Sequence, residues 1–144
     1  MIRIGPRSLL TLLSSLLILT LVGCNRGPTL TPVKGKVLYN GEPLKFGGVM
    51  FQPEGGQPAR AEIQPDGTFT LTTNSRGDGA TVGRNRVRVT CYPAQSPEAQ
   101  ASEGEAALGE SLIPKKYTDI DTSGILVEVS KGGDEVIIEL TDDS

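Results

Sequence analysis

The sequence predicts an all-β domain: a sandwich of two sheets with about seven short strands, six to eight in all, behind a cleaved leader. Apolar and polar residues alternate with a period of two along most of the chain after residue 32, and no helical apolar stripe is found there. The 144 residues include 18 glycines and 10 prolines, which is typical of folds with many tight turns.

Residues 1–23 have the pattern of a secretory signal peptide. Arg3 and Arg7 precede an apolar run from Ser8 to Val22, which is shorter than the ~20 residues that a membrane-spanning helix needs. The segment Leu21-Val22-Gly23-Cys24 then resembles the bacterial lipobox. The alternative is an ordinary signal peptide, or an anchor helix, with a chance cysteine.

The lipobox resemblance implies cleavage between Gly23 and Cys24 and a diacylglyceryl group on the Cys24 thiol. Two or three acyl chains hold a protein stably on a membrane, whereas one does so only marginally. Asn25 is not the aspartate that favours the inner membrane in double-membrane bacteria, so the outer membrane is slightly favoured over the cell membrane. Residues 24–31 are expected to be the lipidated cysteine and a short polar tether.

The expected strands are short and are separated by turn signals. Asn40-Gly41 and Pro65-Asp66-Gly67 are typical of tight turns. Lys131-Gly132-Gly133-Asp134 predicts a hairpin between the last two strands. The expected strands are Val33–Tyr39, Gly48–Gln52, Ala59–Ile63, Thr68–Thr73, Arg84–Tyr92, Ile125–Ser130 and Glu135–Thr141.

Two segments are expected to be loops. The polar, glycine-rich segment from Asn74 to Gly83 is one. The other runs from Pro93 to Pro114 and is unusually long for a compact domain, with one helical turn expected around Glu103–Leu108.

The inward positions of the strands predict the hydrophobic core. Each such side chain contributes about 1.5–3 kcal/mol when it is buried. The predicted core residues are Val37, Val49, Phe51, Phe69, Leu71, Val87, Val89, Val127, Val129 and Ile138.

Composition excludes several classes of function. The chain has no histidine, which removes Ser-His-Asp and Cys-His catalysis and histidine-ligated zinc. Of the 14 basic residues, Arg3 and Arg7 lie in the leader, so 12 basic residues face 17 acidic ones and the net charge beyond it is −5. An acidic domain is a poor nucleic-acid partner.

Two charged groups are candidate sites. Arg84, Arg86 and Arg88 form a stripe on one strand face, which we expect to pair with carboxylates such as Glu128 or Glu139; a basic ligand site is the alternative. For the acidic pair formed by Asp119 and Asp121, an exposed acidic turn is expected, with Ca²⁺ binding as the alternative. No metal or cofactor site is assigned.

The remaining singled-out residues are expected to have structural roles. Cys91 alternates with the core valines and is interpreted as a small buried side chain without a disulfide partner. Tyr117 is expected to pack near one end of the sandwich, with Lys115 and Lys116 exposed. Asp142-Asp143 is interpreted as a solvated tail.

Several motifs resemble carboxypeptidase-regulatory-like, transthyretin-like domains. They are Val33–Val37 with Asn40–Leu44, Gly48–Phe51, Asp66–Leu71 and Asp78–Val89, although Arg86 stands where an aromatic residue is common. The Leu112–Tyr117 segment and the closing strands are similar to small bacterial lipoproteins built on this domain. The resemblance implies a Greek-key sandwich over residues 32–142, a non-catalytic adhesion, stalk or accessory module. The related hydroxyisourate hydrolase relies on histidines, which this chain lacks.

The function expected from these features is that of a non-catalytic, lipid-anchored protein of the cell envelope, facing the periplasm or the cell exterior. Its sandwich would be a structural or protein-interaction module, with the membrane and envelope proteins as partners. The alternative is a carbohydrate- or small-ligand-binding lipoprotein, although only Tyr39, Tyr92 and Tyr117 are available as polar aromatic contacts and tryptophan is absent.

The anchor is tested by Cys24→Ser. We expect this variant to leave the membrane fraction entirely, because the thiol that carries the diacylglyceryl group is gone. Cell fractionation followed by immunoblotting measures the change. Unchanged membrane association of Cys24→Ser would refute the lipid anchor.

Overall fold

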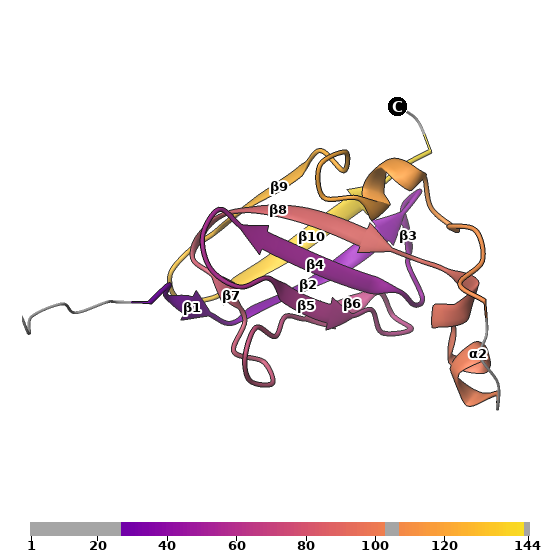
Figure 1. Ribbon diagram of the computed structural model, residues 1–144, viewed down its shortest axis with the longest axis horizontal. Coiled ribbons are helices and arrows are strands. Elements are labelled where there is room, and N and C mark those ends of the chain that lie inside the picture. The colour runs from indigo at the N-terminus through magenta and orange to yellow at the C-terminus, as the bar shows by residue number, and fades with distance from the viewer. Residues whose placement is uncertain (1–26, 103–106, 143–144) are drawn as a thin grey trace, which may run out of the picture.

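The computed structural model describes residues 27–102 and 107–142, and these residues form two four-stranded sheets and a small two-stranded ribbon. Figure 1 shows the strands of one sheet crossing over those of the other, with the last strand at the back. Gly23 and Cys24 lie outside the described residues.

The described part of the chain is mostly β and has ten strands, rather than the six to eight that were predicted. The difference lies in three strands of only two residues each. In chain order the strands are β1 (Leu30–Thr31), β2 (Val33–Tyr39), β3 (Glu42–Pro43), β4 (Gly48–Pro53), β5 (Ala59–Glu62), β6 (Thr68–Thr70), β7 (Ala80–Thr81), β8 (Gly83–Thr90), β9 (Ile125–Val129) and β10 (Asp134–Leu140).

The first sheet is built around β2. β10 runs parallel to β2 over seven residue pairs, from Val33↔Asp134 to Tyr39↔Leu140. On the other side of β2, β6 pairs with its first half and β3 with its second half. Asn40 and Gly41 have φ angles of 50° and 84°, which gives the tight turn between β2 and β3 that this dipeptide predicts.

The second sheet is antiparallel throughout and has the order β5-β4-β8-β9. β5 and β9 are therefore its two edge strands. In the β2 sheet the corresponding positions belong to β6 and β10, so the sandwich has one side formed by β5 and β6 and another formed by β9 and β10.

The predicted hairpin between the last two strands is wrong. β9 pairs with β8 and β10 pairs with β2, so the connection from Ser130 to Gly133 crosses between the sheets. Gly132 and Gly133 have φ angles of 107° and 100°, which lets the chain make this crossing. Thr31 Oγ1 accepts a hydrogen bond from the Gly132 N–H at 3.2 Å. The glycine pattern predicted the turn correctly, but the two strands that this turn connects belong to different sheets.

The core between the sheets is close to the predicted one. Nine of the ten predicted residues are buried, and Val127 is partly buried because it lies on the edge strand β9. Further buried residues come from both ends of the sandwich: Val33, Leu44, Ala59, Ile63, Ala80, Cys91, Ile113, Tyr117 and Leu140.

The domain begins earlier than the predicted tether allows. Leu30–Thr31 pairs with Ala80–Thr81, a strand inside the predicted loop 74–83, and the Thr31 side chain is buried. The last residue of the predicted solvated tail to be described is also engaged. Asp142 accepts hydrogen bonds from the Tyr39 hydroxyl and, at 2.8 Å, from Asn40 Nδ2. Both corrections reflect contacts between segments that are distant in sequence.

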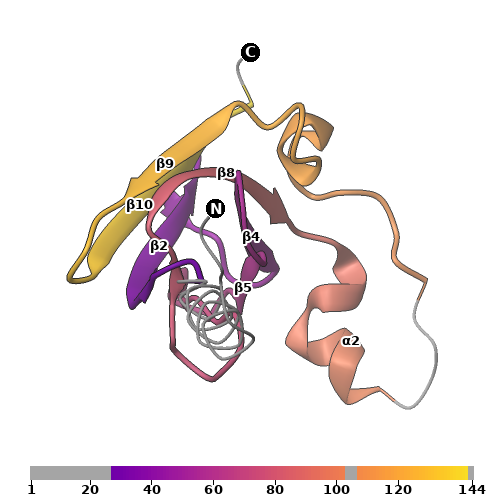
Figure 2. The same ribbon diagram turned by 60° about the vertical axis from the view of Figure 1, so that its left-hand side comes forward.

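The long segment after β8 contains short helical turns outside the sheets (Figure 2). They are η1 (Pro93–Gln95), α2 (Pro97–Ala101) and η2 (Lys115–Thr118). α2 begins after Ser96, whose hydroxyl accepts a hydrogen bond from Ala99 N at 3.1 Å. The helical turn predicted around residues 103–108 falls largely outside the described residues.

Phe69 holds the two sheets together at the centre of the core. Its ring centroid lies 6.3 Å from that of Phe51 on the other sheet. Gly35 on β2 leaves room for this ring, because a Cβ there would lie 2.5 Å from Phe69 Cζ. The packing of the Phe69 ring between the sheets therefore depends on the absence of a side chain at Gly35, its register partner on β2.

We expect Phe69→Ala to lower the free energy of unfolding by about 3–5 kcal/mol, since it removes a buried aromatic ring and leaves a cavity. Thr70→Ala, at the next and exposed position of β6, is the matched control and should change stability by less than about 0.5 kcal/mol. Urea denaturation of the purified protein measures both. Equal stability of the two variants would contradict the central role of Phe69.

Candidate binding surfaces

The predicted arginine stripe lies on the outer face of the β8 sheet, and one of the two expected carboxylates, Glu128, lies beside it. Arg86 forms an ion pair with Asp121, which precedes β9. Arg84 lies opposite Glu128 in the β8–β9 register. Glu139 belongs to the other sheet and is not a partner. Arg88 donates a long hydrogen bond, 3.5 Å, to the Thr118 carbonyl.

The two aspartates of the predicted acidic turn are exposed, and both are already engaged. Asp119 Oδ1 accepts a hydrogen bond from the Asp121 N–H at 2.8 Å, and Asp121 pairs with Arg86. Within residues 27–102 and 107–142, no group of three or more histidines, cysteines, aspartates or glutamates could hold a metal ion. The structure therefore places these carboxylates in a turn and an ion pair.

The tyrosines do not form a common aromatic platform. Tyr117 is buried at one end of the sandwich, as predicted, where its hydroxyl donates to the Thr141 carbonyl at 3.3 Å. The Lys116 ammonium lies 4.6 Å from the Tyr117 ring centroid. Tyr39 is tied to Asp142, and Tyr92 lies beyond the end of β8, directly before η1, where its N–H donates to Gln95 Oε1 at 2.9 Å.

A groove lies on the side of the sandwich formed by β5 and β6. At one end Arg60 and Thr72 exchange two backbone hydrogen bonds of 2.8 and 2.9 Å. At the other end Gln64 N donates to the Thr68 carbonyl at 2.8 Å. Between these two points no ladder joins β5 to β6 in the described part of the chain. The strands are thus tied at both ends and open in the middle.

When β5 and β6 are aligned by these hydrogen bonds, Glu62 and Thr70 lie opposite each other, and the opening lies between them. It is the mouth of a groove of about 1050 Å³, with the buried residues Val49 and Phe69 at its floor. Gly48 adds to the hollow because it places no side chain between Glu62 and Thr90 on the outer face of the β8 sheet. The groove therefore follows from the splaying of two strands and from one missing side chain.

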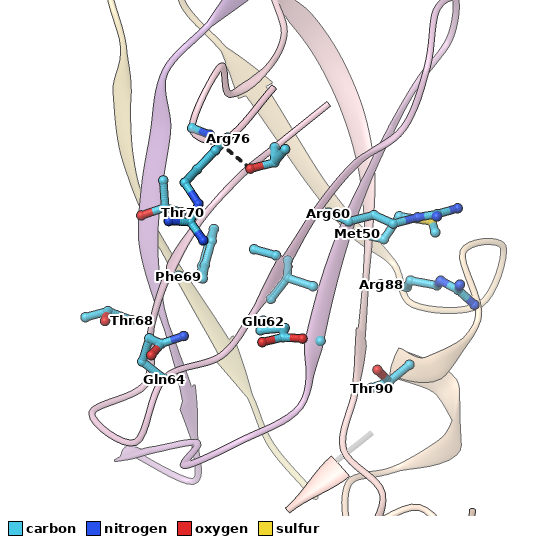
Figure 3. A pocket seen from close by; sticks show the side chains of 15 residues that line it. Met50, Arg60, Glu62, Gln64, Thr68, Phe69, Thr70, Arg76, Arg88 and Thr90 are labelled. Carbon is cyan, nitrogen blue, oxygen red and sulfur yellow. Dashed lines mark hydrogen bonds between the residues drawn. The ribbon is translucent and has the colours of Figure 1, made fainter. Parts of the chain in front are cut away.

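Three arginines from three separate elements line this groove. Arg60 comes from β5, Arg88 from β8 and Arg76 from the loop between β6 and β7. Figure 3 shows Arg76 on one side, Arg60 and Arg88 on the other, and Glu62 between them. We call this feature, with Glu62 as its one acidic side chain, the arginine groove.

The loop that carries Arg76 is held in place by Asp78. The Asp78 carboxylate accepts hydrogen bonds from the N–H groups of Thr73, Asn74 and Ser75, at 2.7, 2.9 and 2.9 Å. These hydrogen bonds keep the pKa of the Asp78 carboxyl below its ordinary value, and the one from the Thr73 N–H has the largest effect. Gly77 N also donates to Thr72 Oγ1 at 3.0 Å. The local hydrogen bonds thus position Arg76 beside the groove.

The side formed by β9 and β10 has a different character. Leu126 and Ile137 expose 62% and 66% of their surface, although both lie on strands. Ile125, Val127 and Val136 are only partly buried beside them. Glu128, Glu135 and Glu139 are exposed on the same two strands. We call this apolar and acidic surface the β9–β10 edge; it lies away from α2 (Figure 2).

Of the charged residues that line the arginine groove, only Arg88 was singled out from the sequence as part of a candidate site. Arg60, Glu62 and Arg76 lie in weakly patterned or loop segments, and alternation shows only that Arg60 and Glu62 share a face. Their proximity to Arg88 depends on which strands become neighbours.

No protein-family model, no curated protein and no solved structure matches this chain. In the described part of the chain no helix has the length and apolar character that crossing a bilayer requires. What the chain does must therefore be inferred from its own residues.

Cys91 is a buried, free thiol, as the alternation pattern predicts. Burial raises the pKa of the Cys91 thiol to about 11, from an ordinary value of 9.0. At pH 8 its thiolate fraction is therefore about a hundredfold lower than that of a free cysteine. Cys91 is accordingly a core residue rather than a reactive one.

We expect native protein to react with a thiol reagent such as DTNB at pH 8 at least about a hundredfold more slowly at Cys91 than guanidinium-unfolded protein does. The absorbance of the thiolate that DTNB releases measures the rate of labelling. The Cys91→Ala variant gives the background from any unmodified Cys24. Fast labelling of native Cys91 would contradict its burial.

Proposed function

We propose that the chain is a non-catalytic, lipid-anchored protein of the cell envelope whose sandwich binds another protein through the β9–β10 edge. The lipobox around Cys24 supports the anchor, and the absence of histidine argues against most hydrolytic chemistry. The two four-stranded sheets, with turns at Asn40-Gly41 and Asp66-Gly67, are compatible with a carboxypeptidase-regulatory-like, transthyretin-like domain with a Greek-key topology.

The open edge of β10 is the observation that carries this proposal. β10 has seven residues, pairs only with β2 among the described strands, and is the end strand of its sheet. Every second residue of such a strand directs its N–H and C=O groups away from the sheet, where an extended segment of a partner can bind them. Natural proteins usually protect an edge this long, so its exposure points to a partner.

The side chains on β10 suggest the chemistry of that partner. Glu135, Ile137 and Glu139 alternate on the outer face, all exposed. A partner strand with an apolar residue flanked by lysines or arginines would match this pattern. A second copy paired antiparallel around Ile137 would instead place Glu135 of one copy opposite Glu139 of the other, which the repulsion of like charges disfavours. We therefore propose an extended basic and apolar segment of another envelope protein.

The alternative function, a ligand-binding lipoprotein, is favoured by the arginine groove. A concave surface lined by apolar residues and a few polar groups is the usual form of a small-molecule site. The groove and the β9–β10 edge lie on different sides of the sandwich, so the two functions do not exclude each other.

Binding at the edge is tested by photocrosslinking in membranes that contain the acylated protein. A photoreactive residue at Leu126 should crosslink to a partner segment in which basic and apolar residues alternate. Ile137→Lys should lower the crosslinking yield by about tenfold, since it removes the apolar side chain that would pack against the partner and adds a charge that repels a basic strand. Ile137 is exposed, so folding should be unaffected.

Leu108→Lys is the matched control, because Leu108 is 57% exposed and lies outside the edge. Its crosslinking yield should equal that of the unaltered chain. An equal loss in both variants, or a crosslinked segment without basic residues, would argue against the proposal. A crosslink to a second copy of this chain would replace the partner with self-association.

A further inference from the structure

We propose that the arginine groove is a binding site for an acidic oligosaccharide, a sugar chain that carries carboxylate groups. This site is separate from the β9–β10 edge, and neither depends on the other. The proposal rests on the arginines, on the hydroxyl groups between them and on the position of Glu62.

The three arginines of the groove have no carboxylate partner in the described part of the chain, where the one salt bridge joins Arg86 to Asp121 outside the groove. Three guanidinium groups and one carboxylate give the groove a local charge of about +2, whereas the chain beyond the leader has a net charge of −5. Arginine binds carboxylates through two parallel hydrogen bonds, so a cluster of arginines without carboxylate partners around a groove favours a ligand with carboxylate groups.

The surroundings of the arginines favour a hydroxylated ligand. Threonine and glutamine side chains can each exchange hydrogen bonds with sugar hydroxyls. Those that line the groove are Gln64, Thr68, Thr70, Thr72 and Thr90. The volume of about 1050 Å³ lies near the upper end of the range for ligand sites and leaves room for several sugar units.

Glu62 indicates how the charges of the ligand are spaced. It lies between Arg76 on one side and Arg60 and Arg88 on the other (Figure 3). A carboxylate at this point repels a uniformly dense polyanion, such as a nucleic acid, and accepts hydrogen bonds from hydroxyl groups. A chain with charges separated by neutral hydroxylated positions therefore fits best.

Neutral sugars are disfavoured because stacking needs an exposed aromatic ring. Among the described residues, Phe69 is the only aromatic one that lines the groove, and just 2% of its surface is exposed. Recognition must then come from charge and hydrogen bonds, and affinity should fall as ionic strength rises.

Isothermal titration calorimetry of the full-length acylated protein in detergent micelles tests the site, with a linear tetramer of galacturonic acid as the probe. We expect saturable binding that weakens with added salt, and none to the methyl ester of the same tetramer, which has the same backbone without charge. Arg60→Gln and Arg76→Gln should each weaken binding by about tenfold.

Arg84→Gln is the matched control, because Arg84 is exposed on β8 but does not line the groove, and it should bind like the unaltered protein. Equal weakening by Arg84→Gln, or equal binding of the methyl ester, would overturn the proposal. So would equally tight binding of inorganic phosphate, or no binding at millimolar tetramer. Self-association that Arg60→Gln abolishes, seen by sedimentation without the tetramer, would assign the groove to a second copy instead.

Discussion

The parallel ladder between β2 and β10 joins the first long strand of the sandwich to the last over seven residue pairs. Because β10 takes this place, β9 must end on the other sheet, and the short connection at Gly132-Gly133 crosses between the layers. This parallel pairing places Ile138 and Leu140 in the core. It also leaves the other side of β10 as an open edge.

This arrangement of the strands gives the sandwich two unlike sides. On one, β5 and β6 are tied together at both ends and open between them into a groove with three arginines. On the other, β9 and β10 present exposed apolar residues among glutamates. An acidic chain thus places three arginines without carboxylate partners among the described residues around one groove, which separates a surface suited to anions from one suited to a basic strand.

Local patterns predicted most of the strands and nine of the 18 hydrophobic residues that are buried in the described part of the chain. The alternation in Thr68–Thr73 predicts the buried positions of Phe69 and Leu71, and Asn40-Gly41 predicts the turn after β2. Pairing could not be predicted in the same way. The Gly-Gly turn reads as a hairpin locally, yet it connects two sheets, and the partner of Arg86 proved to be Asp121 rather than Glu128 or Glu139.

The sequence by itself determined the class of fold and the buried face of each main strand, since period-two alternation is a local property of the chain. Only the tertiary structure decided which strands are neighbours, and therefore which surfaces exist. Arg60, Arg76 and Arg88 are 12 or more residues apart and meet only because strands from different parts of the chain pack beside one another. Such long-range contacts are set by the packing of the whole core, which no single segment encodes.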